Sequence, residues 1–213
     1  MPLRENISVR VTNGFVVTLA ILTALCGIDG SLAILFASLI HELAHWLAII
    51  LCRGRIVRIA CVSGGFSIHA DGIRGGYGGE LLCLISGAAA NIAIGFLLAN
   101  LCAENEYVYI LAGANFASGL FNLIPAGIFD GGRILDLAIT YLIGPRCARN
   151  VYMVVSGISA CVILIGGSLL YLRSGGNLTV LLTTLYLSFL LGYDIIVSFL
   201  GYFRRSRPST ARI

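Results

Sequence analysis

Residues 31–52 read SLAILFASLIHELAHWLAIILC, an apolar run long enough to cross a membrane, with three ionisable side chains in its middle. About 20 apolar residues in a helix match the roughly 30 Å hydrocarbon core of a bilayer. Ionisable groups at that depth are costly, so His41, Glu42 and His45 indicate a functional site. Two histidines four residues apart lie on one helix face, one turn from each other. The run therefore predicts a membrane-spanning helix that carries polar chemistry.

The pattern H-E-x-x-H at residues 41–45 suits the binding of one Zn²⁺. Two imidazole nitrogens converge on the metal, and the glutamate acts as a general base toward water. We predict His41 and His45 as zinc ligands and Glu42 as the base. The competing interpretation is a pair of buried, hydrogen-bonded histidines beside a stray glutamate. A catalytic zinc has three protein ligands as a rule, so the first interpretation requires another one.

Composition predicts an all-α integral membrane protein. Of the 213 residues, 58% are hydrophobic and only 11% are charged, and the mean hydropathy is +0.96. This length fits one membrane-embedded domain, residues 1–213, with about six spans and no appended soluble domain. The seven cysteines form no C-x-x-C pair, so we assign them no metal or disulfide role. Six segments are apolar: about 11–28, which we expect to be a retained first span, 31–52, 81–100, 107–144, 151–172 and 178–203.

The segment 107–144 is too long for one straight span. As a single helix it would be about 57 Å long. Its middle holds residues that interrupt helices, from Asn122 and Pro125 to Gly132. We therefore expect one broken span, which is tolerated in a membrane where the backbone is buried or lines a cavity.

Arginine placement supports this count. All fourteen basic residues are arginine. With the N-terminus in the cytoplasm and one crossing at 107–144, only Arg173 falls on the outer side, as the positive-inside bias requires. Both termini are then cytoplasmic. The net charge of +4 is a topology signal and not a nucleic-acid footprint.

Three aspartates in apolar segments are candidates for the third ligand. Asp130 lies in the broken stretch, where glycines and a freed backbone let a carboxylate reach a facing helix. Asp136 and Asp194 are expected to be structural. His69, the remaining histidine, lies in the predicted hairpin and is another candidate for the third ligand. Asp130 is the better candidate because of its place in the broken stretch.

Two further patterns concern the loop at 53–80 and the span at 81–100. Residues 56–62 and 66–70 predict two short strands around Gly64-Gly65. The edge of that hairpin either pairs with an extended peptide or is an ordinary surface. Gly87, Asn91 and Gly95 recur every four residues. They predict a helix-packing face with Asn91 as a hydrogen-bond bridge.

The motif at 41–45 together with N-x-x-P-x-x-x-x-D-G at 122–131 resembles the two motifs of the site-2 protease family of intramembrane zinc metalloproteases, peptidase M50. The resemblance covers about residues 31–136. It implies a three-helix catalytic core, about 31–144, in which the two motif-bearing spans face each other. It also implies one zinc per chain, bound by His41, His45 and Asp130, with Glu42 as the catalytic base. Asn122 would orient the substrate or stabilise the oxyanion.

The same resemblance implies cleavage of a membrane-tethered protein within or near the cytoplasmic side of the membrane. We expect no PDZ domain and no C-terminal regulatory domain, which makes the chain most similar to the compact sporulation-type branch, related to stage IV sporulation protein FB. That branch processes a membrane-associated pro-sigma factor. Expected partners are a membrane-protein substrate and membrane-protein regulators.

Three alternatives remain. A divalent-metal transporter would also place histidines and carboxylates at the midplane, although no inverted repeat is visible in the sequence. A non-proteolytic binding partner would not need Glu42. A protease of the prenyl-protein-processing type would not need the motif at 122–131.

Overall fold

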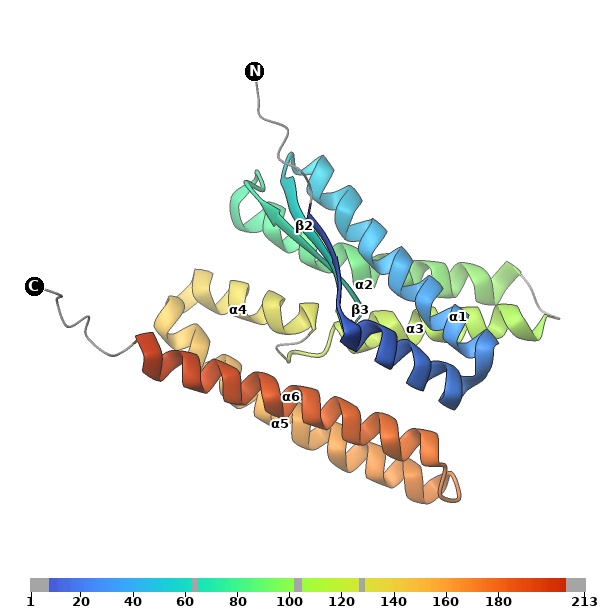
Figure 1. Ribbon diagram of the computed structural model, residues 1–213. Coiled ribbons are helices and arrows are strands. Elements are labelled where there is room, and N and C mark those ends of the chain that lie inside the picture. Colours follow the sequence, from blue (N-terminus) through green and yellow to red (C-terminus); the bar gives the residue numbers. More distant parts are fainter. Residues whose placement is uncertain (1–7, 63–64, 102–104, 127–128, 206–213) are drawn as a thin grey trace, which may run out of the picture. The chain divides into compact units, whose positions relative to one another are not determined.

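The structure is a computed structural model that describes residues 8–62, 65–101, 105–126 and 129–205 of the chain. The chain forms two compact units, Met1–Leu123 and Ile124–Ile213. The first unit holds a small sheet and three helices, and the second holds three more helices (Figure 1). Each unit is described by itself.

The first unit is built on helices α1 (Asn13–Leu51), α2 (Gly76–Leu101) and α3 (Glu106–Asn122), which pack against one another. Helix α1 has 39 residues, which would make a rod about 58 Å long. It bends sharply at Gly27, whose φ of 71° and ψ of −179° suit glycine almost alone. Figure 1 shows the two arms of α1, in dark and lighter blue, meeting in a V. The expected apolar segments 11–28 and 31–52 therefore form the two arms of one bent helix. The bend lies at Gly27 and not at residues 29–30, which separate the two expected segments.

The predicted hairpin is confirmed and belongs to a sheet of order β1-β2-β3. Strands β2 (Arg55–Val62) and β3 (Gly65–Asp71) are antiparallel. Strand β1 (Ser8–Val11), which was not predicted, runs parallel to β2 on its other side. Among the described strands β3 pairs only with β2, so its outer side is a sheet edge. Side chains of the sheet pack on Ala48 and Ile49 at the end of α1 and on Cys83 of α2, which places the sheet close to the histidine motif.

The glycine-rich face of α2 is a close-packing face, as predicted. The side chain of Asn91 is fully buried, and its Nδ2 donates to the carbonyl of Ala37 on α1 at 3.2 Å. At Gly95, an added Cβ would lie 3.0 Å from the ring of Phe116 on α3. Asn91 therefore bridges α2 to α1, one turn before His41.

The second unit contains α4 (Asp130–Ile143), α5 (Pro145–Arg173) and α6 (Leu178–Arg205). Helix α4 packs on α5, and α5 packs on α6. Proline at the first position of α5 suits a helix start, because the N–H that proline lacks would have no partner within the helix at that position. The segment 107–144 is broken as expected, because α3 ends at Asn122 and α4 begins at Asp130. Whether the two pieces form one span stays a prediction.

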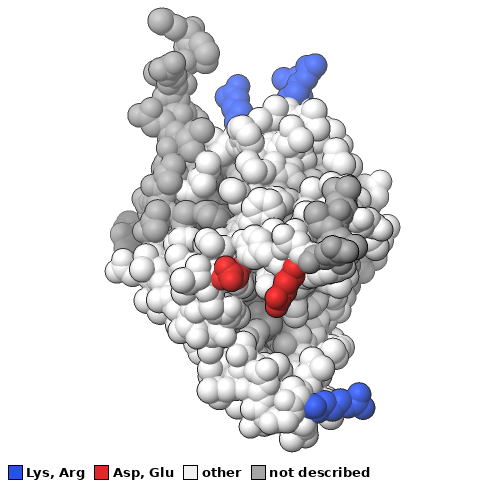
Figure 2. Space-filling model, turned by 90° about the vertical axis from the view of Figure 1, so that its right-hand side faces the viewer, with Lys and Arg blue, Asp and Glu red and all other residues white. Residues whose placement is uncertain are grey.

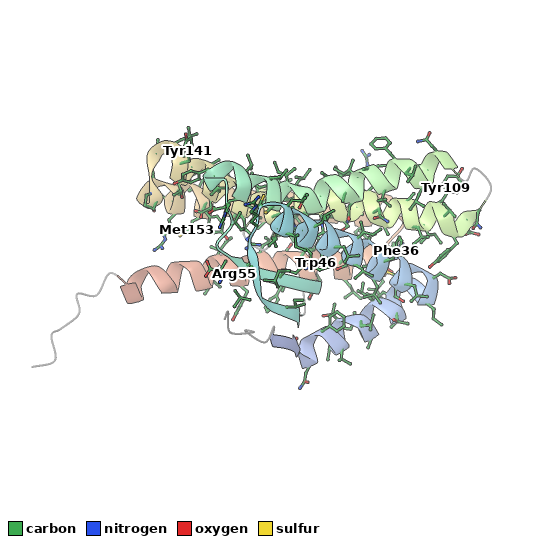
Figure 3. All side chains as sticks on the ribbon, turned by 90° about the horizontal axis from the view of Figure 1, so that it is seen from above. Phe36, Trp46, Arg55, Tyr109, Tyr141 and Met153 are labelled. Carbon is green, nitrogen blue, oxygen red and sulfur yellow. The ribbon has the colours of Figure 1, made fainter. Side chains whose placement is uncertain are left out.

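The chain is an integral membrane protein. Among the described residues three helices are long and apolar enough to cross a membrane: Asn13–Leu51, Gly76–Asn100 and Cys147–Arg173. A shorter apolar helix runs over Leu178–Tyr193. Large apolar side chains such as Phe36 and Trp46 on α1 are 44% and 43% exposed (Figure 3), and the face in Figure 2 carries few charges. Lipid would cover such a surface. The predicted number of six spans stays untested.

Candidate metal centre

The second arm of α1 brings the ring nitrogens of its two histidines together. The Nε2 atoms of His41 and His45 are 2.9 Å apart, and the ring centroids are 4.5 Å apart at nearly a right angle. His41 is only 6% exposed. Spacing of four residues on one helix face produces this approach. Two Nε2 atoms this close either share a proton or direct their lone pairs toward one cation.

Helix α2 determines which nitrogen of His45 carries the proton. Nδ1 of His45 lies 2.6 Å from the carbonyl oxygen of Cys83. A carbonyl only accepts hydrogen bonds, so Nδ1 must be the N–H donor. In the neutral ring Nε2 then carries the lone pair and faces Nε2 of His41. The Oγ of Ser86 also donates to the Cys83 carbonyl at 2.8 Å and lies 3.3 Å from Nδ1. This is the outer-shell arrangement that orients a metal-binding histidine.

Gly87 provides the space that the two rings occupy. A Cβ at this position would lie 2.5 Å from Nε2 of His45, 2.7 Å from Cε1 of His41 and 2.8 Å from its Nδ1. Real Cβ contacts are longer than these values, so only glycine fits while both rings stay in place. The four-residue spacing predicted Gly87 only as a helix-packing residue, and this role was not predicted from the sequence. Its place on the same face of α2 as Asn91, which bonds to Ala37 one turn before His41, was the available signal.

Glu42 lies next to His41 on α1 and is half-buried. Glu42 follows His41 directly and precedes His45 by three residues, and a carboxylate is a group that can serve as a general base toward water. With these donors the first unit fits a divalent metal: two convergent nitrogens, one fixed by an outer-shell carbonyl, and a neighbouring base.

Asp130 is the first residue of α4 in the second unit. It is 7% exposed, and Gly131 and Gly132 after it are also buried. Its Oδ1 lies 3.8 Å from Nη1 of Arg133, one turn later. Both this guanidinium and the helix N-terminus favour the ionised carboxylate. A carboxylate binds metals in its ionised form, and the role of Asp130 as third ligand stays a prediction.

The other residues considered from the sequence lie on α3, on α4, in the sheet and on α6. Asn122 ends α3, is half-buried, and its Nδ2 donates to the carbonyl of Ser118 at 2.9 Å. Asp136 is exposed on α4. The backbone of His69 pairs with Arg58 in the sheet. The side chains of His69 and Asp194 lie outside the described part of the structure.

Similarity to known proteins agrees with the sequence motifs. Residues 98–166 match the model of Peptidase family M50. That range includes Asn122 and Asp130 and does not include the motif at 41–45. The structure is similar to a site-2 protease from Methanocaldococcus jannaschii, with a TM-score of 0.65 and 21% sequence identity over 100% of this chain and 96% of that chain. The two proteins therefore share a fold. No curated protein matches the chain significantly.

Proposed function

We propose that the chain is an intramembrane zinc metallopeptidase of the site-2 protease type. One observation carries the proposal: two histidine Nε2 atoms approach to 2.9 Å inside a membrane-spanning helix, and the outer nitrogen of one is anchored on a backbone carbonyl. The M50 match over residues 98–166 and the shared fold support it. Ionisable groups at bilayer depth carry a large desolvation cost, so they are rare there and mark functional sites.

His41 and His45 hold the metal in this proposal, and Asp130 is the third ligand. Zinc, when bound, supplies Lewis-acid chemistry that makes water a nucleophile near neutral pH. Glu42 takes the proton of the attacking water at its carboxylate and returns it to the leaving amine. Asn122 is a candidate donor to the developing oxyanion, because a side-chain amide has two N–H groups and only one is used by Ser118.

The substrate we propose is a membrane-tethered protein that is cut near the cytoplasmic side. A helical substrate must unwind, because its peptide groups are hydrogen-bonded within the helix. The edge of β3 offers an extended strand to pair with. A pro-sigma factor as the substrate, and with it the sporulation-type branch, rests on the motif resemblance alone. Membrane-protein regulators are likewise part of the proposal.

The test compares Glu42→Gln with the wild-type chain. Both are expressed with their native membrane proteins, and new protein N-termini are identified by mass spectrometry. We expect Glu42→Gln to bind zinc stoichiometrically and to produce none of the new N-termini. Glu80→Gln, a change at an exposed carboxylate on α2, is the matched control and should behave as wild type. Undiminished cleavage by zinc-loaded Glu42→Gln would refute the mechanism.

The third ligand is tested by zinc content. We expect Asp130→Asn to lower zinc affinity, while the exposed Asp136→Asn leaves it unchanged. His69→Ala should also retain zinc. If His69→Ala loses zinc and Asp130→Asn does not, the assignment of Asp130 is wrong.

The divalent-metal transporter is not favoured by the M50 match or by the shared fold. Zinc uptake into proteoliposomes distinguishes the two functions. A peptidase should give no uptake above protein-free vesicles.

A further inference from the structure

A shallow cavity of about 420 Å³, widely open to the surface, lies in the first unit where α1 ends and α2 begins. Its walls include Arg53, Arg74, three glycines of the α2 start, and the apolar side chains of Leu51 and Leu82. None of the proposed site residues lines it. A volume of this size is within the range of small-molecule sites.

The cavity is cationic, and none of the described residues on its wall carries a compensating negative charge. Both arginines are exposed, and no acidic residue is among the residues that line the cavity. Within the described part of the chain, neither guanidinium has a carboxylate at ion-pair distance. Two arginines that share one cavity without a counter-ion make a site for an anion, and the planar guanidinium suits phosphate oxygens in particular.

The two arginines are held near each other by the backbone. The N–H of Arg74 donates to the carbonyl of Cys52, the residue before Arg53, at 2.8 Å. Arg53 also adopts a φ of 55°, and it is the only non-glycine residue in the described structure with a positive φ. Glycine is the usual residue at such a position after a helix. An arginine there retains a charge at the expense of an unfavourable backbone conformation.

The opposite rim of the cavity is apolar. Leu51 is 69% exposed and Leu82 is 53% exposed. Both residues lie within helices that are candidates to span the membrane, close to the ends of these helices. The cavity thus has a cationic part at the end of the spans and an apolar part that continues along them. An amphiphile with an anionic head matches this division.

We propose that this cavity binds the phosphate group of an anionic phospholipid, with the acyl chains lying over Leu51 and Leu82. Arg53 and Arg74 contact the phosphate oxygens. Gly78 leaves open space on the cavity wall, because an added Cβ there would meet nothing within 4 Å. This inference does not depend on the proposed peptidase activity, since none of its residues belongs to the metal centre.

The test measures lipid binding to the full chain, purified in a neutral detergent. Phosphatidylglycerol, phosphatidylcholine or inorganic phosphate is titrated, and bound ligand is counted by native mass spectrometry alongside the melting temperature. The variants are Arg53→Gly and Arg74→Gln, with Arg173→Gln at the end of α5 as the matched control. Arg53→Gly should fold at least as well as wild type, because glycine accepts a φ of 55°.

We expect phosphatidylglycerol to bind and to raise the melting temperature, and each cavity variant to weaken its binding about fivefold. Arg173→Gln should bind as wild type does. Equal phosphatidylglycerol binding by wild type and both cavity variants would overturn the proposal, and so would equal binding of phosphatidylcholine. Saturation by inorganic phosphate at the same concentrations would identify a site for a soluble phosphate compound and refute the lipid assignment. If Arg53→Gly does not fold, Arg74→Gln alone decides.

Discussion

Replacing Gly87 by alanine should disable the metal centre while leaving its ligands in the sequence. The new Cβ would lie 2.5 Å from Nε2 of His45 and 2.7 Å from Cε1 of His41. An ordinary contact is at least about 3.5 Å, so one or both rings must move by about 1 Å. Metal sites tolerate deviations of about 0.2 Å in ligand distance. We therefore expect zinc affinity to fall by at least the 10- to 100-fold typical of outer-shell damage.

The assay is a chelator competition that gives the zinc dissociation constant of the purified protein in detergent. Zinc content by mass spectrometry and the melting temperature accompany it. Overpacking at one position costs about 1–3 kcal/mol, so Gly87→Ala should still fold. The matched control is Gly113→Ala on the exposed side of α3, where an added Cβ would meet nothing within 4 Å. It should bind zinc as wild type does.

An unchanged zinc dissociation constant in folded Gly87→Ala would refute this reasoning. It would mean that the rings of His41 and His45 do not hold the metal in the arrangement described above.

Three further changes test the supports of the site and of α1. Asn91→Leu removes the buried bond to Ala37, and it should lower the stability of the protein by about 0.6–2 kcal/mol in a thermal or denaturant assay; no loss would show that the bridge contributes nothing. Ser86→Ala should weaken zinc binding by less than about tenfold, because the Cys83 carbonyl still accepts from His45; complete zinc loss would contradict this division of roles. Gly27→Ala forces alanine into a glycine conformation and should cost about 1–3 kcal/mol of stability, whereas a more stable variant would argue against the bend.

The sequence was sufficient for the parts of the fold that hydropathy and turn residues control. The apolar segments, the hairpin and the helix break after Asn122 follow from composition and glycine placement, and the structure contains all three. The expected break between the first two apolar segments was placed at Asp29 and Gly30, because these residues are typical of loops. The bend in fact lies at Gly27, where the positive φ interrupts the helix. Strand β1 was not predicted, because it pairs in parallel with β2, which is distant in sequence, and such pairing leaves no turn signal next to the strand.

At the candidate site, the sequence motifs identify the proposed metal ligands better than they identify the groups that orient these ligands. His41, Glu42 and His45 stand out as ionisable residues in an apolar run. The carbonyl of Cys83 is a backbone group, so no residue type marks it. The clearance at Gly87 depends on the packing of α2 against α1, and helix spacing alone indicates only that a close contact exists.

X-ray absorption at the zinc edge of the purified protein measures the ligands of the proposed metal centre. That proposal predicts one zinc per chain, with two imidazole nitrogens at about 2.0–2.1 Å and a carboxylate oxygen at about 2.0–2.2 Å. The imidazole signal should disappear in a variant with both His41 and His45 replaced by alanine. A protein that purifies without metal under zinc-replete conditions, or a zinc shell dominated by sulfur from the cysteines, would contradict it.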